Sequence, residues 1–92
     1  MEQKHWWVYM VQTIGGRLYT GITTDPQRRF KEHVSGGRLG ARFFRTDPAQ
    51  AMVYLEIQVD RSAASRREAT IKKLTRQKKL SLVEAYMAAK VV

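Results

Sequence analysis

Two stretches rich in β-forming residues flank a pair of glycines near the N-terminus, and this pattern constrains the fold more than any other. The first stretch is Trp6 to Gln12, the second is Leu18 to Thr23, and Gly15 and Gly16 lie between them. Aromatic and β-branched residues favour strands, and glycine supplies the positive backbone dihedral angles that a tight hairpin requires. The sequence therefore predicts an antiparallel β-hairpin.

The length of the hairpin loop decides whether Tyr9 and Tyr19 face the same side of the sheet. A two-residue turn at the glycine pair would place the two tyrosines on opposite faces, because side chains alternate along a strand. A three-residue loop, with Thr13 opposite Arg17, would place both on one face. The sequence leaves these two alternatives open.

The residues after the hairpin predict a helix and then a long irregular segment. Thr24 or Asp25 can cap the helix, Pro26 suits its first position, and a Ser-Gly-Gly run ends it after about Val34. Residues 35–50 show no hydrophobic period. A loop of this length in a small domain is usually functional or mobile.

A third strand is predicted over residues 51–59, where the side chains alternate. One face of this strand would be formed by Val53, Leu55, Ile57 and Val59. The alternation predicts that these four residues turn together toward one side of the sheet.

Two helices complete the pattern. Asp60 or Ser62 can cap a helix that runs to about residue 74. The last helix begins at Arg76 or, with Ser81 as a capping residue, at Leu82, and it runs to about residue 89. The element order ββαβαα predicts a small sheet with helices packed on it.

The chain is strongly basic. Its 92 residues include 17 Lys and Arg against 8 Asp and Glu, a formal net charge of +9. This balance favours nucleic acid as the partner, since an anionic membrane would need a basic amphipathic helix with bulky aromatic residues. The length predicts a single domain over residues 1–92. Without cysteine, a membrane-length apolar run or a signal peptide, the chain is expected to be cytoplasmic and not bound to a membrane. The sequence leaves its protein partners unknown.

Glu68 is the one acidic residue in the strongly basic stretch from Arg61 to Lys79. On a helix it borders the apolar arc that contains Ala64 and Ile71. It can form an ordinary intrahelical ion pair with Lys72, or it can be a carboxylate at the sheet edge that binds a hard cation such as Mg²⁺.

Arg29 and His33 are four residues apart and share one face of the first predicted helix. They can simply form part of a solvated basic surface. Together with a carboxylate in one cleft they would suit phosphoryl chemistry, because arginine binds phosphate in a fork geometry and histidine moves protons near neutral pH.

The ordered set of these residues resembles the GIY-YIG nuclease family, and within it the small bacterial YhbQ-like, or UPF0213, group. The resemblance rests on Trp7-Val8-Tyr9, on Tyr19-Thr20-Gly21, and on the later Arg29, His33 and Glu68, and it covers nearly the whole chain. It implies an α/β (α+β) fold with a three-stranded antiparallel sheet flanked by helices. Gly21 would belong to the second motif.

The resemblance also implies hydrolysis of a phosphodiester bond with one divalent ion, Mg²⁺ or Mn²⁺, held by Glu68. Arg29 would stabilise negative charge on phosphorus. Tyr9 would take the proton from the attacking water, with His33 as its proton acceptor and Tyr19 orienting the water. The alternative assignment makes Tyr19 the base. The substrate implied is DNA cut with little sequence specificity, in repair or recombination.

Further basic and aromatic residues are candidates for contacts with the nucleic acid. Phe43 or Phe44 could stack on an unpaired base, although anchoring of the long loop in the core is the more ordinary role of at least one of them. The candidates for phosphate contacts are Arg28, Arg38, Arg42, Arg45, Lys72 and Lys73.

The chain departs from the family pattern at three points. Trp7 stands where the first motif usually has glycine, Thr20 replaces an aliphatic residue of the second, and the chain has no asparagine to match the family's C-terminal one. The missing asparagine favours an alternative function, a non-catalytic nucleic-acid-binding module that keeps the fold. A weaker alternative is an accessory domain that binds the acidic surface of a protein partner.

Overall fold

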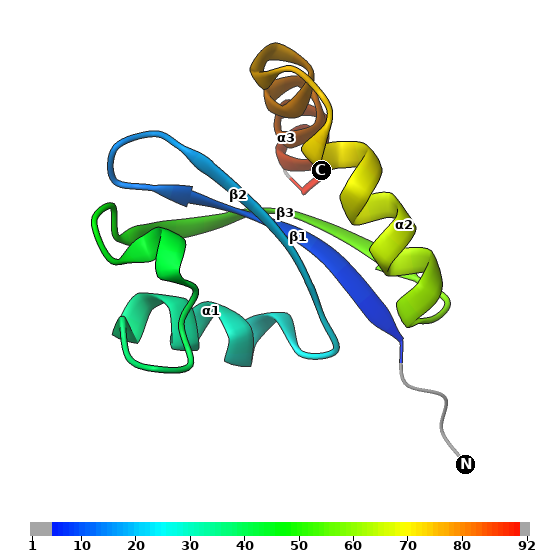
Figure 1. The fold of residues 1–92 in the computed structure, drawn as a ribbon. Helices are drawn as coiled ribbons and strands as arrows, with labels where there is room; N and C mark the ends of the chain where they lie inside the picture. The colour runs from blue at the N-terminus through cyan, green and yellow to red at the C-terminus, as the bar shows by residue number, and fades with distance from the viewer. Residues whose placement is uncertain (1–4, 91–92) are drawn as a thin grey trace.

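The structure, a computed structural model, describes residues 5–90 and has the predicted element order ββαβαα (Figure 1). A short 3-10 helix, η1, follows the first α-helix. The elements are β1 (Trp6–Thr13), β2 (Leu18–Thr23), α1 (Pro26–Ser35), η1 (Arg42–Phe44), β3 (Ala49–Gln58), α2 (Arg61–Lys72) and α3 (Arg76–Lys90). None of the helices in the described residues has the length and apolar character needed to span a bilayer.

The three strands form one antiparallel sheet in the order β2-β1-β3, so β1 is the central strand. The hairpin adopts the three-residue alternative, because the Thr13 amide donates to the Arg17 carbonyl at 2.9 Å. Gly16 takes the left-handed conformation, with φ of 88°, that closes such a loop. Tyr9 and Tyr19 therefore lie on the same face of the sheet.

The hairpin loop is attached to the residues that lead into β3. The Thr13 hydroxyl donates to the Asp47 carboxylate at 2.6 Å, and the Gly15 amide donates to the same carboxylate at 2.9 Å. The Thr13 hydroxyl bond and then the Gly15 bond hold the pKa of Asp47 below its ordinary value. The first residue of α3, Arg76, also donates to the Gly16 carbonyl at 2.8 Å.

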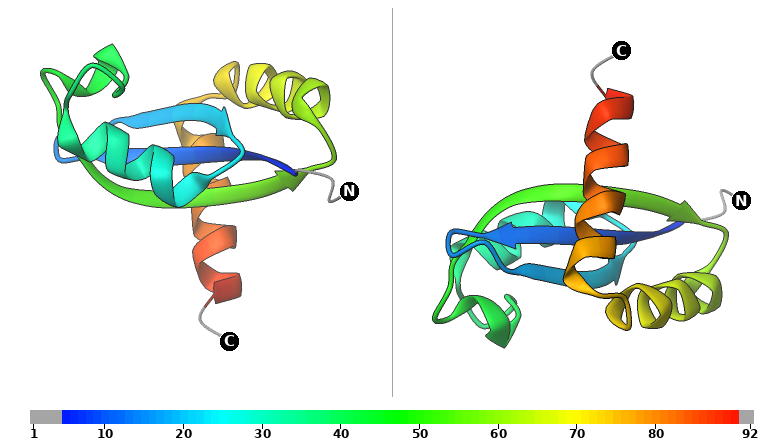
Figure 2. Two further views of the ribbon diagram at one scale, coloured as in Figure 1. Left: turned by 90° about the horizontal axis from the view of Figure 1, so that it is seen from below. Right: turned by 90° about the horizontal axis from the view of Figure 1, so that it is seen from above.

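The sheet is the middle layer of three (Figure 2). Helices α2 and α3 cover one face, where Val8 and Met10 pack against Ala64 and Ile71. Helix α1 and η1 lie on the opposite face, which carries the buried cluster of Tyr9, Val11 and Phe44. The predicted apolar arc of α2 is confirmed, and the two tyrosines lie on the α1 side.

The predicted alternation of β3 is wrong at its centre. Met10 pairs with Tyr54 and the next residue of β1, Val11, pairs with Met52, so Val53 lies in a β-bulge. Because the bulge adds a residue, Val53 and Tyr54 both pack on the α2 side, while Leu55 packs with the Tyr9 cluster. Ile57 and Val59, predicted on the same face as Val53 and Leu55, are exposed.

Capping side chains set the helix starts. The Asp25 carboxylate accepts from the Arg28 amide at 3.1 Å, and the Asp60 carboxylate accepts from the Ala63 amide at 2.8 Å. These two bonds select Asp25 and Asp60 from the predicted alternatives. The last helix begins at Arg76, so the alternative start at Leu82 with Ser81 as the capping residue is wrong. The Ser81 hydroxyl donates instead to the Gln77 carbonyl within the helix.

Candidate active site

The Tyr9 side chain lies over Gly21, its pairing partner on the edge strand β2. Tyr9 pairs with Gly21, and a Cβ atom at Gly21 would lie 2.5 Å from the Tyr9 hydroxyl. The absence of a side chain at Gly21 thus lets the phenol extend over β2 toward the edge of the sheet. The Tyr9 residue is only 1% exposed, and its ring lies 6.2 Å from that of Tyr19.

The space at Gly21 yields a direct test, because replacing this residue with alanine would force the Tyr9 ring out of position. We expect Gly21→Ala to cost about 1–3 kcal/mol of stability through overpacking. The measurement is the melting temperature, with a fall of about 4 °C or more per kcal/mol in a domain of this size. Gly37→Ala is the matched control, because its Cβ would have 4.0 Å to the nearest atom. Equal melting temperatures for the two variants would contradict this role of Gly21.

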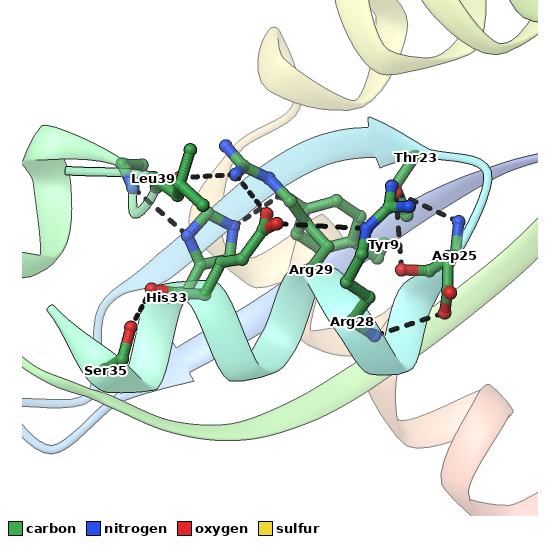
Figure 3. Close-up of polar contacts among 10 residues, drawn as sticks. Tyr9, Thr23, Asp25, Arg28, Arg29, His33, Ser35 and Leu39 are labelled. Carbon is green, nitrogen blue, oxygen red and sulfur yellow. Dashed lines mark hydrogen bonds and ion pairs between the residues drawn. The ribbon is translucent and has the colours of Figure 1, made fainter. Parts of the chain in front are cut away.

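His33 holds the Tyr9 hydroxyl from α1. Its Nε2 atom lies 2.7 Å from the Tyr9 oxygen, and its Nδ1 atom accepts a hydrogen bond from the Ala41 backbone amide at 3.2 Å (Figure 3). The imidazole is 1% exposed and packs against Phe44, with ring centres 4.6 Å apart. Burial, and then the charge of Arg29, lowers the pKa of His33 to about 4, so the ring is neutral near pH 7.

The Ala41 amide fixes the tautomer of His33. An amide N–H can only donate, so Nδ1 must present its lone pair and the single ring proton of the neutral imidazole must lie on Nε2. His33 therefore donates its Nε2 proton to the Tyr9 oxygen. A ring in this state has no free lone pair for the Tyr9 proton. The role of His33 as the proton acceptor of Tyr9 stays a prediction, and it would require a different protonation state from this one.

The buried, neutral state of His33 predicts loss of stability in acid. The pKa is about 4 in the folded chain, against about 6.5 for an unperturbed histidine. The unfolded chain therefore binds the extra proton first, and the free energy of unfolding should fall as the pH drops from about 6.5 to about 4, by as much as about 3 kcal/mol.

Urea unfolding of the wild type and of His33→Gln at several pH values measures this effect. Above pH 6.5 the contribution of His33 is present in full, and only the wild type should lose it within the acid window. His5→Gln serves as the control because His5 is exposed. If wild type and His33→Gln showed parallel pH dependence over this window, His33 would not be neutral in the folded chain.

Arg29 is held beside Tyr9 by two acceptors. Its Nη1 atom donates to the Glu32 carboxylate at 2.8 Å and to the Leu39 carbonyl at 2.6 Å (Figure 3). Burial raises the pKa of Tyr9 well above its ordinary value and Tyr19 adds to the rise, whereas a hydrogen bond and the charge of Arg29 oppose it. Arg29 is thus the cationic side chain that favours the ionised form of Tyr9.

Glu68 approaches Tyr9 from the other layer of the molecule. It lies on α2, which packs against β2 and β1, and its negative charge contributes the smallest part of the rise in the pKa of Tyr9, after burial and Tyr19. Its side chain is 23% exposed, and its carboxylate forms an ion pair with Lys72 at 3.4 Å. The intrahelical pair is therefore present, and the carboxylate also remains accessible to a cation.

A single carboxylate is compatible with a magnesium site. Within residues 5–90, no group of three or more His, Cys, Asp or Glu side chains is placed to hold a metal ion. Mg²⁺ needs fewer, because it usually binds one or two carboxylates and completes its shell with water and substrate phosphate. Glu68 fits that requirement, and in this structure its carboxylate is paired with Lys72.

The basic candidates are exposed on both sides of the sheet. Arg38, Arg42 and Arg45 lie in the segment that packs on the α1 side, and Lys72 and Lys73 end α2 on the other. Arg28, on the first turn of α1, is exposed as well and lies 3.8 Å from the Glu32 carboxylate.

The two loop phenylalanines are committed to packing. Phe44 is 4% exposed and belongs to the Tyr9 cluster, which confirms the anchoring role expected for at least one of the pair. The guanidinium carbon of Arg17 lies 4.1 Å from the ring centre of Phe43, so Arg17 covers one face of that ring. The stacking role predicted for Phe44 is wrong because the ring is buried, and Phe43 packs against Tyr19 and Phe44 as well.

Sequence reasoning missed the groups that orient Arg29 and His33. Glu32 carried a signal, since it is three residues from Arg29 on the same helix and can reach it. The Leu39 carbonyl and the Ala41 amide are backbone groups of the irregular segment. No residue type encodes such contacts, so nothing in the sequence could have indicated them.

Comparison with known proteins agrees with this fold. The model of the GIY-YIG catalytic domain matches residues 5–81. The chain therefore belongs to the GIY-YIG catalytic domain family. More narrowly, it is 48% identical over 80 residues to a UPF0213 protein of Pseudomonas aeruginosa, covering 87% of this chain and 75% of that protein.

Two further relatives place the chain in the same group. The UPF0213 protein YhbQ of Escherichia coli is 41% identical over 78 residues, covering 85% of this chain and 76% of YhbQ. The solution NMR structure of a UPF0213 protein from Bacillus halodurans superposes with a TM-score of 0.55 at 36% identity, covering 88% of this chain and 84% of that one. This similarity confirms the predicted family and the three-stranded fold.

Proposed function

We propose that the chain is a metal-dependent phosphodiester hydrolase that cuts DNA with little sequence specificity. One observation carries the proposal: the buried Tyr9 hydroxyl meets a histidine donor and an arginine from α1, with a carboxylate of α2 nearby. Phenol, guanidinium and carboxylate are the groups that phosphodiester hydrolysis needs for proton transfer, charge stabilisation and metal binding.

Tyr9 is proposed as the general base. As a phenolate it would accept the proton of the attacking water while the water oxygen bonds to phosphorus and the bond to the leaving sugar oxygen breaks. Because the pKa of Tyr9 is raised, only a small fraction of Tyr9 is ionised near pH 7. The residues around the hydroxyl therefore have to stabilise the phenolate. The Nε2 proton of His33 and the guanidinium of Arg29 both point positive charge at the phenol oxygen.

Arg29 would have a second role at the substrate. Its Nη1 atom is already bound to Glu32 and Leu39, so the guanidinium is held in one orientation before the substrate arrives. Such preorganised positive charge stabilises the negative charge that builds up on the phosphate oxygens in the transition state. Glu32 would thus act as a positioning residue.

Glu68 would hold Mg²⁺ or Mn²⁺. When bound there, such an ion would supply positive charge that stabilises the phosphate and the leaving oxygen. The exposed Lys72 ammonium, 3.4 Å from Glu68, would have to move away when the ion binds. Exposed lysine and arginine side chains on both sides of the sheet would contact the DNA backbone without reading its sequence.

The alternative function is a non-catalytic nucleic-acid-binding module. The ion pair between Glu68 and Lys72 favours it, because this pair already satisfies the carboxylate without a metal. In that case the basic surface alone would account for binding. A role in DNA repair or recombination, and residence in the cytoplasm, are parts of the proposal that rest on family likeness and on composition.

The test is cleavage of labelled single-stranded, duplex, flap and RNA substrates by the purified chain with Mg²⁺ or Mn²⁺. We expect cleavage of DNA that stops when EDTA is added. Binding without cleavage on every substrate would decide for the binding module. Cleavage that continues in EDTA would contradict the metal requirement.

A further inference from the structure

Trp7 differs from every other aromatic residue of the chain. All of the aromatic residues lie within residues 5–90, and Trp7 alone among them packs in neither hydrophobic cluster, although it is partly buried. Its neighbour Trp6, by contrast, packs on the α2 side. Because the Trp7 ring contributes to neither core, what lies around it decides its role.

Trp7 lines a cleft. The other lining residues are His5, Thr24, Asp25 and Arg28, and the cleft has a volume of about 320 Å³. This volume is at the lower end of the range of about 300–1,000 Å³ for small-molecule sites, so the cleft can take a single flat group rather than an extended chain.

The cleft lies next to the Tyr9 site on the same face of the sheet. Trp7 and Tyr9 are two residues apart on β1, a separation of about 7 Å, and they pair with Thr23 and Gly21 of β2. Arg28 is the immediate neighbour of Arg29 on α1. A group in the cleft would therefore be one nucleotide away from a phosphate held at Tyr9 and Arg29.

The chemistry of the lining suits a base better than a phosphate. The Asp25 carboxylate caps α1 by accepting from the Arg28 amide, and its negative charge opposes a phosphate at this position. The same carboxylate and the Thr24 hydroxyl can accept hydrogen bonds from the amino and imino groups of a base. Indole and guanidinium groups both stack on the flat face of a base.

We propose that this cleft binds one unpaired nucleobase of the strand whose phosphate occupies the Tyr9 site. The inference rests on the proposed function and deepens it, because it makes an unpaired strand the preferred substrate. In a duplex both faces of a base are stacked on its neighbours, so only a base that has left the stack can present a face to Trp7. The loop phenylalanines cannot serve instead, since Phe44 is buried and Arg17 covers Phe43.

Direct binding without divalent ions tests the cleft separately from cleavage. The chain has two tryptophans, so Trp6→Phe leaves Trp7 as the single indole fluorophore. The probes are a short oligothymidine, an oligomer of equal length and charge whose nucleosides are abasic, and a blunt duplex, all in EDTA. We expect oligothymidine to quench Trp7 fluorescence, and the abasic oligomer to bind without quenching.

Affinity measurements on variants give the second readout. Trp7→Ala should weaken oligothymidine binding by about 5- to 150-fold, the range for loss of one stacked base, and should leave binding of the abasic oligomer unchanged. Trp7→Phe should keep most of the affinity, because a ring remains. Circular dichroism and the melting temperature of Trp7→Ala show whether the variant is folded.

The outcomes separate the two proposals. An unchanged preference for oligothymidine over the abasic oligomer in folded Trp7→Ala would overturn the base site, even if the chain cuts DNA. A Trp7-dependent preference in a chain that cuts nothing would uphold the base site and refute the hydrolase. Preference of the wild type for the blunt duplex over oligothymidine would overturn the inference as well.

Discussion

Replacing Glu68 with glutamine should abolish DNA cleavage while leaving affinity for DNA intact. Glutamine keeps the shape of the side chain but removes the negative charge that a hard cation requires. Glu68 belongs to no group of three or more potential metal ligands within residues 5–90, so the loss of its charge should weaken the metal site strongly. The net charge rises from +9 to +10, and affinity for the polyanion should stay the same or increase slightly.

The measurement is the cleavage rate and the dissociation constant at equal Mg²⁺ concentration. Glu84→Gln is the matched control, because it makes the same change of charge at an exposed position of α3. If Glu68 only pairs with Lys72, its replacement should cost a few tenths of a kcal/mol of stability and leave the cleavage rate unchanged. Undiminished cleavage by Glu68→Gln would place the metal elsewhere.

Removing the Tyr9 hydroxyl should have the second large effect. Tyr9→Phe keeps the ring over Gly21 and loses only the oxygen that contacts His33 and Arg29. Loss of a general base costs about 10²- to 10⁴-fold in rate. Tyr19→Phe is the matched variant, and it should lose much less, because the hydroxyl of Tyr19 would only orient the water.

The pH dependence of the wild-type rate gives an independent check on Tyr9. Burial and Tyr19 raise its pKa above the ordinary value of about 10, so the phenolate fraction should still be growing at pH 9. The rate should then climb steadily from pH 7 to 9 without a plateau.

The two tyrosine variants also decide which tyrosine is the base. A larger loss of cleavage rate in Tyr19→Phe than in Tyr9→Phe would identify Tyr19 as the base.

The parts of the fold that the sequence predicted are those with local signals. The two strands of the hairpin, the caps at Asp25 and Asp60 and the apolar arc of α2 each depend on residues within a few positions of one another. The ordered motifs then indicated the family, and with it the positions of Tyr9 and Glu68 on neighbouring elements.

The parts that the sequence could not predict depend on contacts between distant segments. The glycine pair allows either loop length, and attachment to Asp47 accompanies the one adopted. The bulge at Val53 breaks an alternation that is regular in the sequence. The tautomer of His33 follows from a backbone amide eight residues away, whose donor carries no residue signature.

The three-residue hairpin loop limits how this chain can vary in length. Loop tips usually accept insertions, but here the register of β2 carries Tyr19 and Gly21 into their places beside Tyr9. A shift of the pairing by one residue would send both to the far side of the sheet, against α2. Even a longer loop that kept the parity would separate Gly15 from Asp47 and Gly16 from Arg76. An affinity tag or an inserted domain is therefore better attached at the end of α3 than at this hairpin.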